Sequence, residues 1–518
     1  MRVLIFHGYL LRGTGSNIYN ASLCRALVHL GHEVHLLCQD RDAASLDFVD
    51  AIGTFEGGTL RMETARDRPR CSVYLPDIGG VLPLYVADRY EGFRALPFPE
   101  LDDEGLERYL EGNVAAVREV AGRVQPDVAL ANHLVMGPVI LARGLAGRVP
   151  YAVKVHGSAL EYTIRPNRER FLPFALEGLG AAAAVLVGSR HTAESLWEVT
   201  ADPGLPERTR LGPPGVDIHS FRPRPPEQVR DGLLGLAERI ESGEATAWGG
   251  ERGAAEALRS LHPARDRIVS YVGKLIVSKG IDLLLAAWPR VVGQVPQARL
   301  LVVGFGTYRD AALRIVEALA TRDLDDLRQV AAKGRELEGG PPGELRHLAT
   351  FLDGLEGDCR DAYLQAAPAA AARVHFTGRL EHDDLPEVLP ACEAQVMPST
   401  FPESFGMVAA EAAACGTLPL SAGHSGMAEV TAALAPALEE RLRPLLSFQV
   451  GPGSVEEIAG KLVGWLTLEA DRRERVAAAL AERAASRFGW ETVAEGVIAA
   501  ALGRLDDVPA PVDSLPPP

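Results

Sequence analysis

Residues 2–37 read RVLIFHGYLLRGTGSNIYNASLCRALVHLGHEVHLL, and this stretch decides the fold class. Arg2–Phe6 is a short run of Val, Leu, Ile and Phe, a composition typical of a buried parallel strand. Asn17–Leu30 has leucines at helical spacing, and Gly31 ends the helix that this spacing predicts. Because Glu33–Leu37 has the pattern of a second strand, the segment predicts a βαβ unit, which requires a parallel sheet.

The alternation of strand and helix continues in two series. In the first, further strands are predicted at Val128–Ala131, Tyr151–Val155 and Ala184–Val187. A polar zone rich in Pro and Gly, at about 225–265, interrupts the alternation and is predicted to be a linker or an insertion. The second series begins with a strand at Ile268–Val272, a helix at Gly280–Val291 and a strand at Ala298–Val303.

The sequence therefore predicts an α/β protein with two doubly wound domains that face each other across a cleft. The first domain is expected to span residues 1–224 and the second residues 266–489. A stretch at about 309–373 is rich in Ala, Leu, Glu and Arg, which predicts a helical insertion in the second domain. The Pro-rich tail, residues 507–518, is expected to be disordered.

Composition limits the class of protein. The chain has 518 residues, 47% of them hydrophobic and 24% charged, so we expect a globular protein of about two to four domains. A net charge of −16 disfavours a general nucleic-acid-binding surface. No apolar run approaches the about 20 residues of a membrane span, and peripheral membrane contact stays open. Six cysteines without C-x-x-C spacing, and no signal peptide, indicate a cytoplasmic protein.

Residues 402–416, PESFGMVAAEAAACG, carry the strongest chemical signal, two glutamates separated by seven residues. A helix is predicted to begin between them, and the residues at its positive end, which suit a diphosphate, are Phe405, Gly406, Met407 and Val408. Glu403, in the preceding loop, can accept hydrogen bonds from sugar hydroxyls, and Glu411, on the helix body, can hold a ribose diol. In isolation, the same pattern also fits a structural helix on which the second Glu is solvated.

A second motif, Gly273–Gly280, follows the first strand of the second series. Its two lysines, Lys274 and Lys279, are five residues apart in a loop bounded by glycines, so that both charges can converge on one pair of phosphates. Lysines in an ordinary polar turn are the alternative for this loop taken alone.

A third motif, Phe376–Leu380, also joins a strand end to a loop. The backbone at Arg379 and Leu380 can bond the edge of a base, and Gly378 permits a close approach. A plain strand-to-helix turn is the alternative. All three motifs lie at the carboxyl ends of predicted parallel strands, where open α/β sheets bind their ligands.

Taken in this order, the motifs resemble the family 4 glycosyltransferases of the GT-B fold, which consists of two Rossmann-like domains. The resemblance extends to Pro214–Pro223, to Gly31–Val34 and to Phe488–Glu491, where the family has a C-terminal crossover helix, expected here at about 490–506. It covers most of the chain apart from the two insertions and the tail. The family transfers a sugar from a nucleotide diphosphate sugar with retention of configuration, and it needs no catalytic metal ion or other cofactor.

The resemblance implies a role for each motif. Lys274 and Lys279 would bind the diphosphate, Glu411 the ribose and Glu403 the sugar, and the backbone of Arg379 would meet the base. The first domain would bind the acceptor, a small molecule, a lipid or a glycan. There the loop that ends at Gly15 would approach the phosphates or the acceptor, and His156 would face the donor sugar. The family usually has Arg at the position of Lys274 and Asn at that of Pro214.

Two other kinds of protein remain as alternatives. One is a different enzyme on the same fold, such as a nucleotide-sugar epimerase or an inverting transferase. The other is a non-catalytic nucleotide-sugar-binding or scaffolding protein. A dehydrogenase is disfavoured because the chain lacks the G-x-G-x-x-G pattern of dinucleotide-binding domains.

Overall fold

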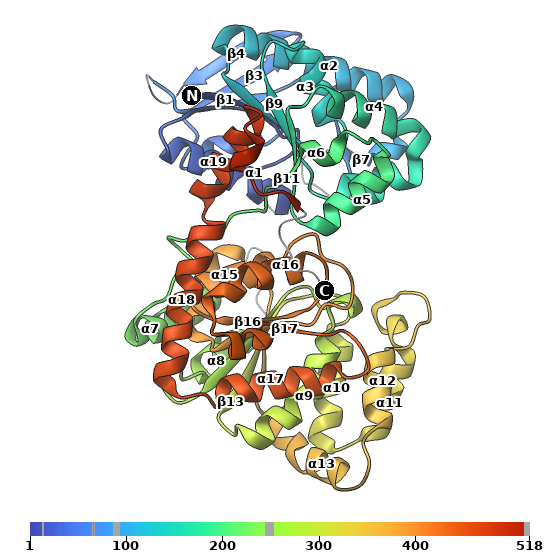
Figure 1. Cartoon of the computed structure of the whole chain (residues 1–518), viewed down its shortest axis with the longest axis vertical. Coiled ribbons are helices and arrows are strands. Elements are labelled where there is room, and N and C mark those ends of the chain that lie inside the picture. The colour runs from blue at the N-terminus through green and yellow to red at the C-terminus, as the bar shows by residue number, and fades with distance from the viewer. Residues whose placement is uncertain (13–14, 65, 67, 86–93, 244–252, 512–518) are drawn as a thin grey trace. The chain divides into compact units, whose positions relative to one another are not determined.

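The computed structural model describes residues 1–518 except 13–14, 65, 67, 86–93, 244–252 and 512–518. The chain forms two compact units, each an α/β layer structure with a central sheet (Figure 1). Unit 1 comprises Met1–Gly215 and Phe488–Pro518, and unit 2 comprises Val216–Arg487.

Unit 1 is built on a nine-stranded sheet in which all neighbouring strands are parallel except β3 and β4, which form an antiparallel hairpin. The predicted βαβ unit lies at its centre, where β1 pairs with β2 on one side and β8 on the other. In spatial order the strands are β11 (Thr209–Leu211), β10 (Ala184–Val187), β9 (Tyr151–Lys154), β8 (Val128–Asn132), β1 (Arg2–Phe6), β2 (Glu33–Leu37), β5 (Cys71–Leu75), β3 (Ala51–Glu56) and β4 (Thr59–Thr64).

Helices cover both faces of this sheet, and each face has its own apolar core. One core contains buried residues of α1 and α19, and the other contains buried residues of α2, α3 and α4. The helices are α1 (Gly15–His29), α2 (Asp103–Val124), α3 (Gly137–Leu145), α4 (Arg168–Gly180), α5 (Arg190–Thr200) and α19 (Trp490–Ala501). The last of these returns from the far end of the chain and packs against α1.

Unit 2 has a six-stranded sheet in which every pairing is parallel. The strands, in spatial order, are β14 (Val374–Gly378), β13 (Ala298–Val303), β12 (Arg267–Val272), β15 (Ala394–Met397), β16 (Leu418–Ala422) and β17 (Ser447–Phe448). The chain runs outward from β12 to β14, then returns to the other side of β12 and runs outward again through β15 and β16. Open α/β sheets bind their ligands beside such a reversal, which falls between the carboxyl ends of β12 and β15 in this sheet.

The two regions without a sequence-based role are folded into unit 2. The zone at 225–265, expected as a linker or insertion, contains α7 (Pro226–Ser242) and α8 (Ala254–Ser260), which pack on each other. The apolar side chains of α7 are spaced along one face, which explains why it docks instead of extending as a linker. The insertion at 309–373 is helical as predicted, with α10 (Arg309–Thr321), α11 (Leu324–Lys333), α12 (Arg346–Asp353) and α13 (Gly357–Ala371).

Apart from the short helices α6 (Leu205–Arg208) and α14 (Leu385–Val388), the remaining α-helices belong to the second half of the chain. They are α9 (Ile281–Gln294), α15 (Met407–Ala414), α16 (Ser425–Leu434), α17 (Ser454–Leu466) and α18 (Ala470–Phe488), which leads into α19. The crossover helix expected at about 490–506 corresponds to α19, which begins at Trp490 and ends at Ala501.

The beginning of the tail is ordered, contrary to the prediction for 507–518. Asp507 belongs to a short 3-10 helix, Val508 is buried, and the backbone N–H of Leu211 donates to the Pro509 carbonyl at 2.7 Å. This bond satisfies a backbone group of the edge strand β11, which outweighs the Pro-rich composition up to residue 511. Residues 512–518 lie outside the described part of the chain.

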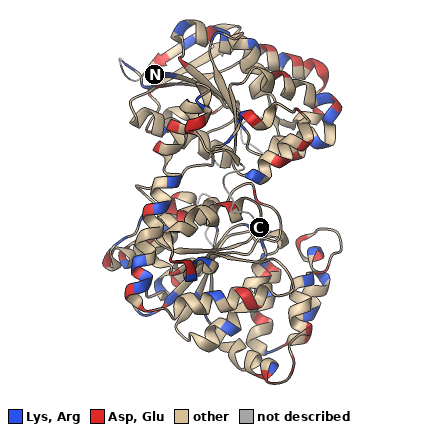
Figure 2. Ribbon diagram, viewed as in Figure 1, with Lys and Arg blue, Asp and Glu red and all other residues tan. Residues whose placement is uncertain are grey.

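Charges are mixed over the helices. Figure 2 shows Lys, Arg, Asp and Glu interspersed along the helices of both units, while the strands are nearly free of charge. Among the described residues, no helix combines the length and the apolar character that crossing a membrane requires.

The contact between Gly215 and Trp490 gives a test of how α19 is held. A Cβ atom on Gly215 would lie 2.5 Å from Cδ2 of the buried Trp490 ring. We therefore expect Gly215→Ala to destabilise unit 1 by about 1–3 kcal/mol, which is typical of overpacking. Differential scanning calorimetry measures the change.

The control for this substitution is Gly122→Ala in α2. A Cβ atom there meets nothing within 4 Å, so the variant should be as stable as the wild type or more stable, because Ala favours helix over Gly. Equal effects of the two substitutions would contradict the packing role of Gly215.

Candidate active site

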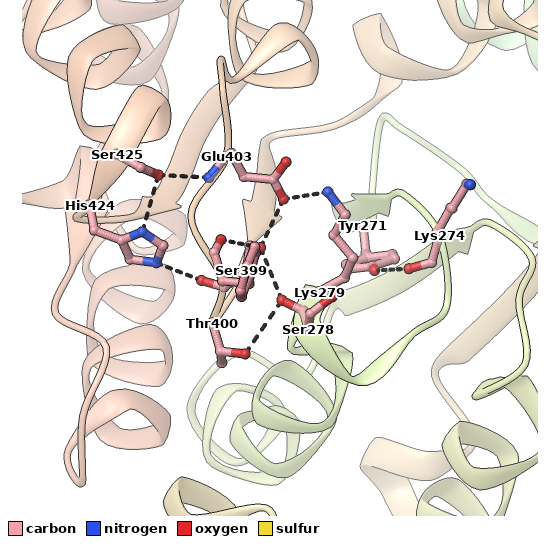
Figure 3. Close-up of polar contacts among 10 residues, drawn as sticks. Tyr271, Lys274, Ser278, Lys279, Ser399, Thr400, Glu403, His424 and Ser425 are labelled. Carbon is pink, nitrogen blue, oxygen red and sulfur yellow. Dashed lines mark hydrogen bonds and ion pairs between the residues drawn. The ribbon is translucent and has the colours of Figure 1, made fainter. Parts of the chain in front are cut away.

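Two of the predicted motifs meet at the point where the strand order of unit 2 reverses. Lys279 ends the 3-10 helix η5 (Val277–Lys279) after β12, and Glu403 lies in the loop after β15. Their side chains form an ion pair, and the Ser399 hydroxyl donates to the same carboxylate oxygen, Oε1, at 2.8 Å. Figure 3 shows the amine and the carboxylate pointing toward each other from the two loops.

Backbone contacts clamp these loops together. The Ser278 carbonyl accepts from the Thr400 N–H at 2.9 Å, and the Ser399 hydroxyl oxygen lies 3.0 Å from the same carbonyl (Figure 3). Gly280 ends η5 with φ +67°, and a Cβ atom there would collide with the Pro398 carbonyl. Only glycine combines this backbone conformation with so close an approach. The loop that carries Lys279 is thus fixed against the loop that carries Glu403.

The N-termini of two helices converge on the same loop. The N–H of Glu403 donates to the Ser425 hydroxyl at 2.9 Å, and the N–H of Gly426, at the start of α16, donates to the Glu403 carbonyl at 2.9 Å. At the start of α15, no acceptor within the described part of the chain pairs with the N–H groups of Gly406, Met407 and Val408. Unpaired N–H groups at the positive end of a helix can bind an anion, so this end of α15 remains a candidate for the predicted diphosphate site.

Lys274 and Lys279 differ in their surroundings. Lys274 is exposed, and its amine has no partner among the described residues, whereas Lys279 is partly buried and paired with Glu403. The Tyr271 hydroxyl donates to the Lys274 carbonyl at 2.8 Å, so the backbone of this lysine is held while its side chain is available (Figure 3). The Lys279 amine is therefore held in place by Glu403, whereas the Lys274 amine is free to contact a ligand.

Glu411 is buried, which excludes the alternative of a solvated helix residue. Its side chain is 2% exposed, and its Oε1 lies 2.8 Å from His382 Nε2. Burial lowers the pKa of His382, but the hydrogen bond to Glu411 and the charges of Glu411, Asp383 and Asp217 outweigh it, so the net shift is upward. The contact with His382 occupies one of the two carboxylate oxygens of Glu411.

Gly378, Arg379 and Leu380 end β14 and begin the following loop, as predicted. The prediction used only the backbone of Arg379, but its side chain is also fixed. Its Nε lies 3.1 Å from Glu381 Oε1, and its guanidinium lies over the Phe305 ring at 5.2 Å. Phe305 is 45% exposed, so an aromatic face and a guanidinium stack beside the backbone of Gly378 and Arg379.

His156 in unit 1 belongs to a network of neutral polar side chains. Asn132 Nδ2 donates a hydrogen bond to Asn20 Oδ1 at 2.7 Å. The Oδ1 atom of Asn132 is therefore the acceptor for His156 Nε2 at 2.8 Å. His156 is then protonated on Nε2, and its Nδ1 has no partner in the described residues. Burial, followed by the charges of His133 and Lys154, lowers the pKa of His156 well below its usual value.

His7 and His133 are buried parts of the same cluster. His133 stacks at 5.7 Å on His7 and lies 4.7 Å from His156. Burial lowers the pKa of His7 to about 4, and burial and His7 together lower that of His133. Gly15, the first residue of α1, is exposed with open space around it, and residues 13–14 of its loop lie outside the described residues.

Several residues of the site are missing from the sequence-based prediction: Ser399, His424, Ser425, His382 and Phe305. His424 bonds the Ser399 carbonyl at 2.9 Å and the Ser425 hydroxyl at 3.1 Å. Ser425 follows β16, so the rule that ligand sites lie at carboxyl ends of parallel strands could have found it. His382 has no such signal, because only the folded chain brings it to Glu411.

Two family models match the chain. The model described as glycosyl transferases group 1 matches residues 363–481, and the model described as glycosyl transferase 4-like domain matches residues 14–204. The D-inositol 3-phosphate glycosyltransferase of Xylanimonas cellulosilytica is 27% identical over 93% of this chain and 90% of that protein. The protein of the same name from Mycobacterium tuberculosis is 27% identical over 57% of this chain and 43% of that protein.

Solved structures share the fold. Anabaena HepE, in complex with UDP, matches 98% of this chain and 100% of its own with a TM-score of 0.54 and 18% identity. Sucrose-phosphate synthase from Thermosynechococcus elongatus matches 95% of this chain and 96% of its own with a TM-score of 0.51 and 20% identity. The chain therefore has the GT-B fold with two Rossmann-like domains, which confirms the predicted fold class.

The raised pKa of His382 predicts how stability depends on pH. Below the unfolded pKa of about 6.5, the imidazole is charged and its attraction to Glu411 is fully present. This contribution is lost as the pH rises through the raised pKa of the folded protein. We expect the melting temperature of His382→Gln to fall further below that of the wild type at pH 6 than at pH 9.

A wild-type advantage over His382→Gln that does not change with pH would contradict the charged pair.

Proposed function

We propose that this chain, which belongs to the group 1 glycosyltransferases, transfers a sugar from a nucleotide diphosphate sugar to an acceptor, with retention of anomeric configuration and without a catalytic metal ion. The observation that carries the proposal is the Lys279–Glu403 pair beside the unpaired N–H groups of α15. A nucleotide-sugar donor requires a cation and a helix N-terminus for its diphosphate and a carboxylate for its sugar, all within a few ångströms of each other.

In the proposed reaction, the bond between the anomeric carbon and the β-phosphate oxygen breaks, and negative charge develops on the departing diphosphate. Lys274, Lys279 and the α15 N–H groups stabilise that charge electrostatically. The acceptor hydroxyl forms the new bond on the same face of the sugar and gives its proton to the departing phosphate. No covalent enzyme intermediate is needed.

The remaining residues are assigned to donor recognition. We assign Glu411 to the ribose diol, because His382 occupies one carboxylate oxygen and leaves the other. The backbone after Gly378 is assigned to the base. His156 is assigned to a sugar hydroxyl, since a neutral imidazole protonated on Nε2 can accept on Nδ1.

Known relatives suggest which substrates to try first. UDP is bound in the HepE structure, so UDP and UDP-sugars are the first donors to test. D-inositol 3-phosphate is the first acceptor to test, because two relatives carry it in their names. An epimerase would change the donor without an acceptor, and a non-catalytic binding protein would leave it intact, so the transfer product separates the alternatives.

The cytoplasm is the proposed compartment. All six cysteines are free thiols, five of them buried, which fits a reducing environment.

Metal independence gives the first test of the mechanism. With EDTA present, UDP should still raise the melting temperature, because binding to the native state stabilises it and protein cations hold the phosphates. Loss of binding on chelation would contradict the metal-free site.

The proposed mechanism also predicts the configuration of the product. The transferred sugar should keep the anomeric configuration of the donor in the NMR spectrum of the product, and inversion would contradict the mechanism.

Lys279→Ala should separate catalysis from folding. The variant should lose about 10²–10³ in transfer rate, because it loses a preorganised positive charge at the departing phosphate. Its stability should change by no more than about 1 kcal/mol, since the pair is partly exposed. Lys274→Arg, which keeps the charge, is the control and should remain active. Near wild-type turnover of Lys279→Ala at saturating donor would refute the phosphate assignment.

A further inference from the structure

The helical insertion at 309–373 reaches the loop that carries Lys279. The backbone N–H of Val277 donates to Glu338 Oε2 at 2.7 Å, across 61 positions of the sequence. Val277 is the first residue of η5, and Lys279 is the last. Glu338 ends the 3-10 helix η6 (Arg335–Glu338), which follows α11 within the insertion. A carboxylate of the insertion therefore caps the short helix that presents the phosphate-binding lysine.

This carboxylate satisfies a donor that would otherwise be unpaired. The first N–H groups of a helical turn have no partner within the turn, and a negative charge at that end is favourable. The Glu338 side chain is only 12% exposed, and its Oε1 lies 3.4 Å from Arg335 Nε. The N–H of Arg335 donates to the Gly343 carbonyl at 3.0 Å, which closes the loop around η6. Glu338 is thus held in place before any ligand arrives.

The other anchors of this loop come from the sheet itself. The N–H of Leu275 donates to the Phe305 carbonyl at 2.8 Å, and the Leu275 carbonyl accepts from Tyr308 at 2.9 Å. Ser278 is fixed from the β15 side by Ser399 and Thr400 (Figure 3). Between these anchors, the turn has its own bonds, from the Lys279 N–H to the Ile276 carbonyl at 3.0 Å and from the Gly280 N–H to the Val277 carbonyl at 3.0 Å. The acceptor for the Val277 N–H, by contrast, is the Glu338 carboxylate. The loop's central turn therefore depends on a group outside the sheet.

We propose that Glu338 is a positioning residue of the donor site, through which the insertion sets the geometry of the Lys279 loop. The inference rests on the proposed function, since it concerns the loop assigned to the diphosphate. Without the carboxylate, the Val277 N–H loses its acceptor and η5 loses its cap, so Lys279 leaves the position in which it meets both Glu403 and a phosphate. A misplacement of about 1 Å at a catalytic group can cost up to about 10²-fold in rate.

Three variants of the full chain test the proposal. Glu338→Ala removes the acceptor, and Glu338→Gln keeps a carbonyl oxygen that can accept from Val277 but removes the charge. Glu336→Ala removes an exposed acid from the same short helix and is the matched control. None of the three changes a residue assigned to contact the donor.

The first measurement is amide hydrogen exchange of the ligand-free proteins, read from peptides that cover residues 274–280. Glu338→Ala should exchange at least about tenfold faster there than the wild type, because local opening becomes easier when a cap is lost. Glu338→Gln should lie in between, and Glu336→Ala should match the wild type. Unchanged exchange in Glu338→Ala, or equal acceleration in Glu336→Ala, would overturn the proposal.

The second measurement is steady-state transfer. Glu338→Ala should lower kcat by about tenfold or more with a smaller change in the donor KM, and Glu338→Gln should restore most of the rate. A fall in melting temperature without any change in kcat would reduce Glu338 to a structural residue. If the wild type neither binds UDP, GDP or ADP nor transfers a sugar, the proposed function fails, whereas the exchange result still decides whether Glu338 holds the loop.

Discussion

The reversal of strand order between β12 and β15 is the constraint on which the donor half of the molecule depends. Because the two strands are neighbours but their following helices belong to opposite runs of the sheet, their loops diverge and leave room for a ligand. The loops must still be held, and the contacts of Ser278 with Ser399 and Thr400 do so. This close approach requires glycine at position 280, because the Cβ atom of any other residue would strike the Pro398 carbonyl.

The loops at this reversal carry positive electrostatic features that would repel one another without compensation. They are Lys274, Lys279 and the N-termini of α15 and α16. Glu403 offsets part of this positive charge, and Ser399 fixes its carboxylate. In the proposed function, an arriving diphosphate would bring more negative charge than Glu403 supplies, so it would be attracted to the remaining donors without the lysine having to reorient. Preorganisation of this kind keeps the reorganisation energy of the reaction small.

Unit 1 solves a different electrostatic problem. Its polar cluster at the carboxyl ends of β1, β8 and β9 contains His7, His133 and His156, whose pKa values are all lowered by burial. These imidazoles are neutral near pH 7. Asn20 and Asn132 link His7 to His156 through hydrogen bonds, and the His133 ring lies against both of these histidines. Lys154 is buried as well, and burial lowers its pKa to about 7. Unit 1 therefore offers hydrogen bonds with little charge, which suits hydroxyl groups.

The sequence predicts those parts of the structure whose cause is local. Arg2–Phe6 and Glu33–Leu37 become the expected strands because a buried parallel strand needs a continuous apolar run. The helix after Glu403, α15, can be predicted because its sequence, MVAAEAAA, is rich in alanine, the residue with the highest helix propensity. By contrast, His382 meets Glu411 across 29 positions, and the order of residues 507–511 depends on one bond to an edge strand. Such long-range pairs leave no periodic signal, so a single sequence cannot reveal them.

The insertion shows how a long-range contact can arise at little thermodynamic cost. Lengthening a surface connection adds only about 0.6 kcal/mol of closure entropy per doubling, so a chain can accept extra helices between two strands. The apolar faces of α10 and α11 then decide where the added segment packs. In this chain they bring η6 beside η5, and a carboxylate at that point meets an N–H group that needs an acceptor. In our proposal, the insertion at 309–373 therefore helps to position the loop that carries Lys279. Substitutions in the insertion would then affect sugar transfer through the hydrogen bond between Glu338 and the Val277 N–H.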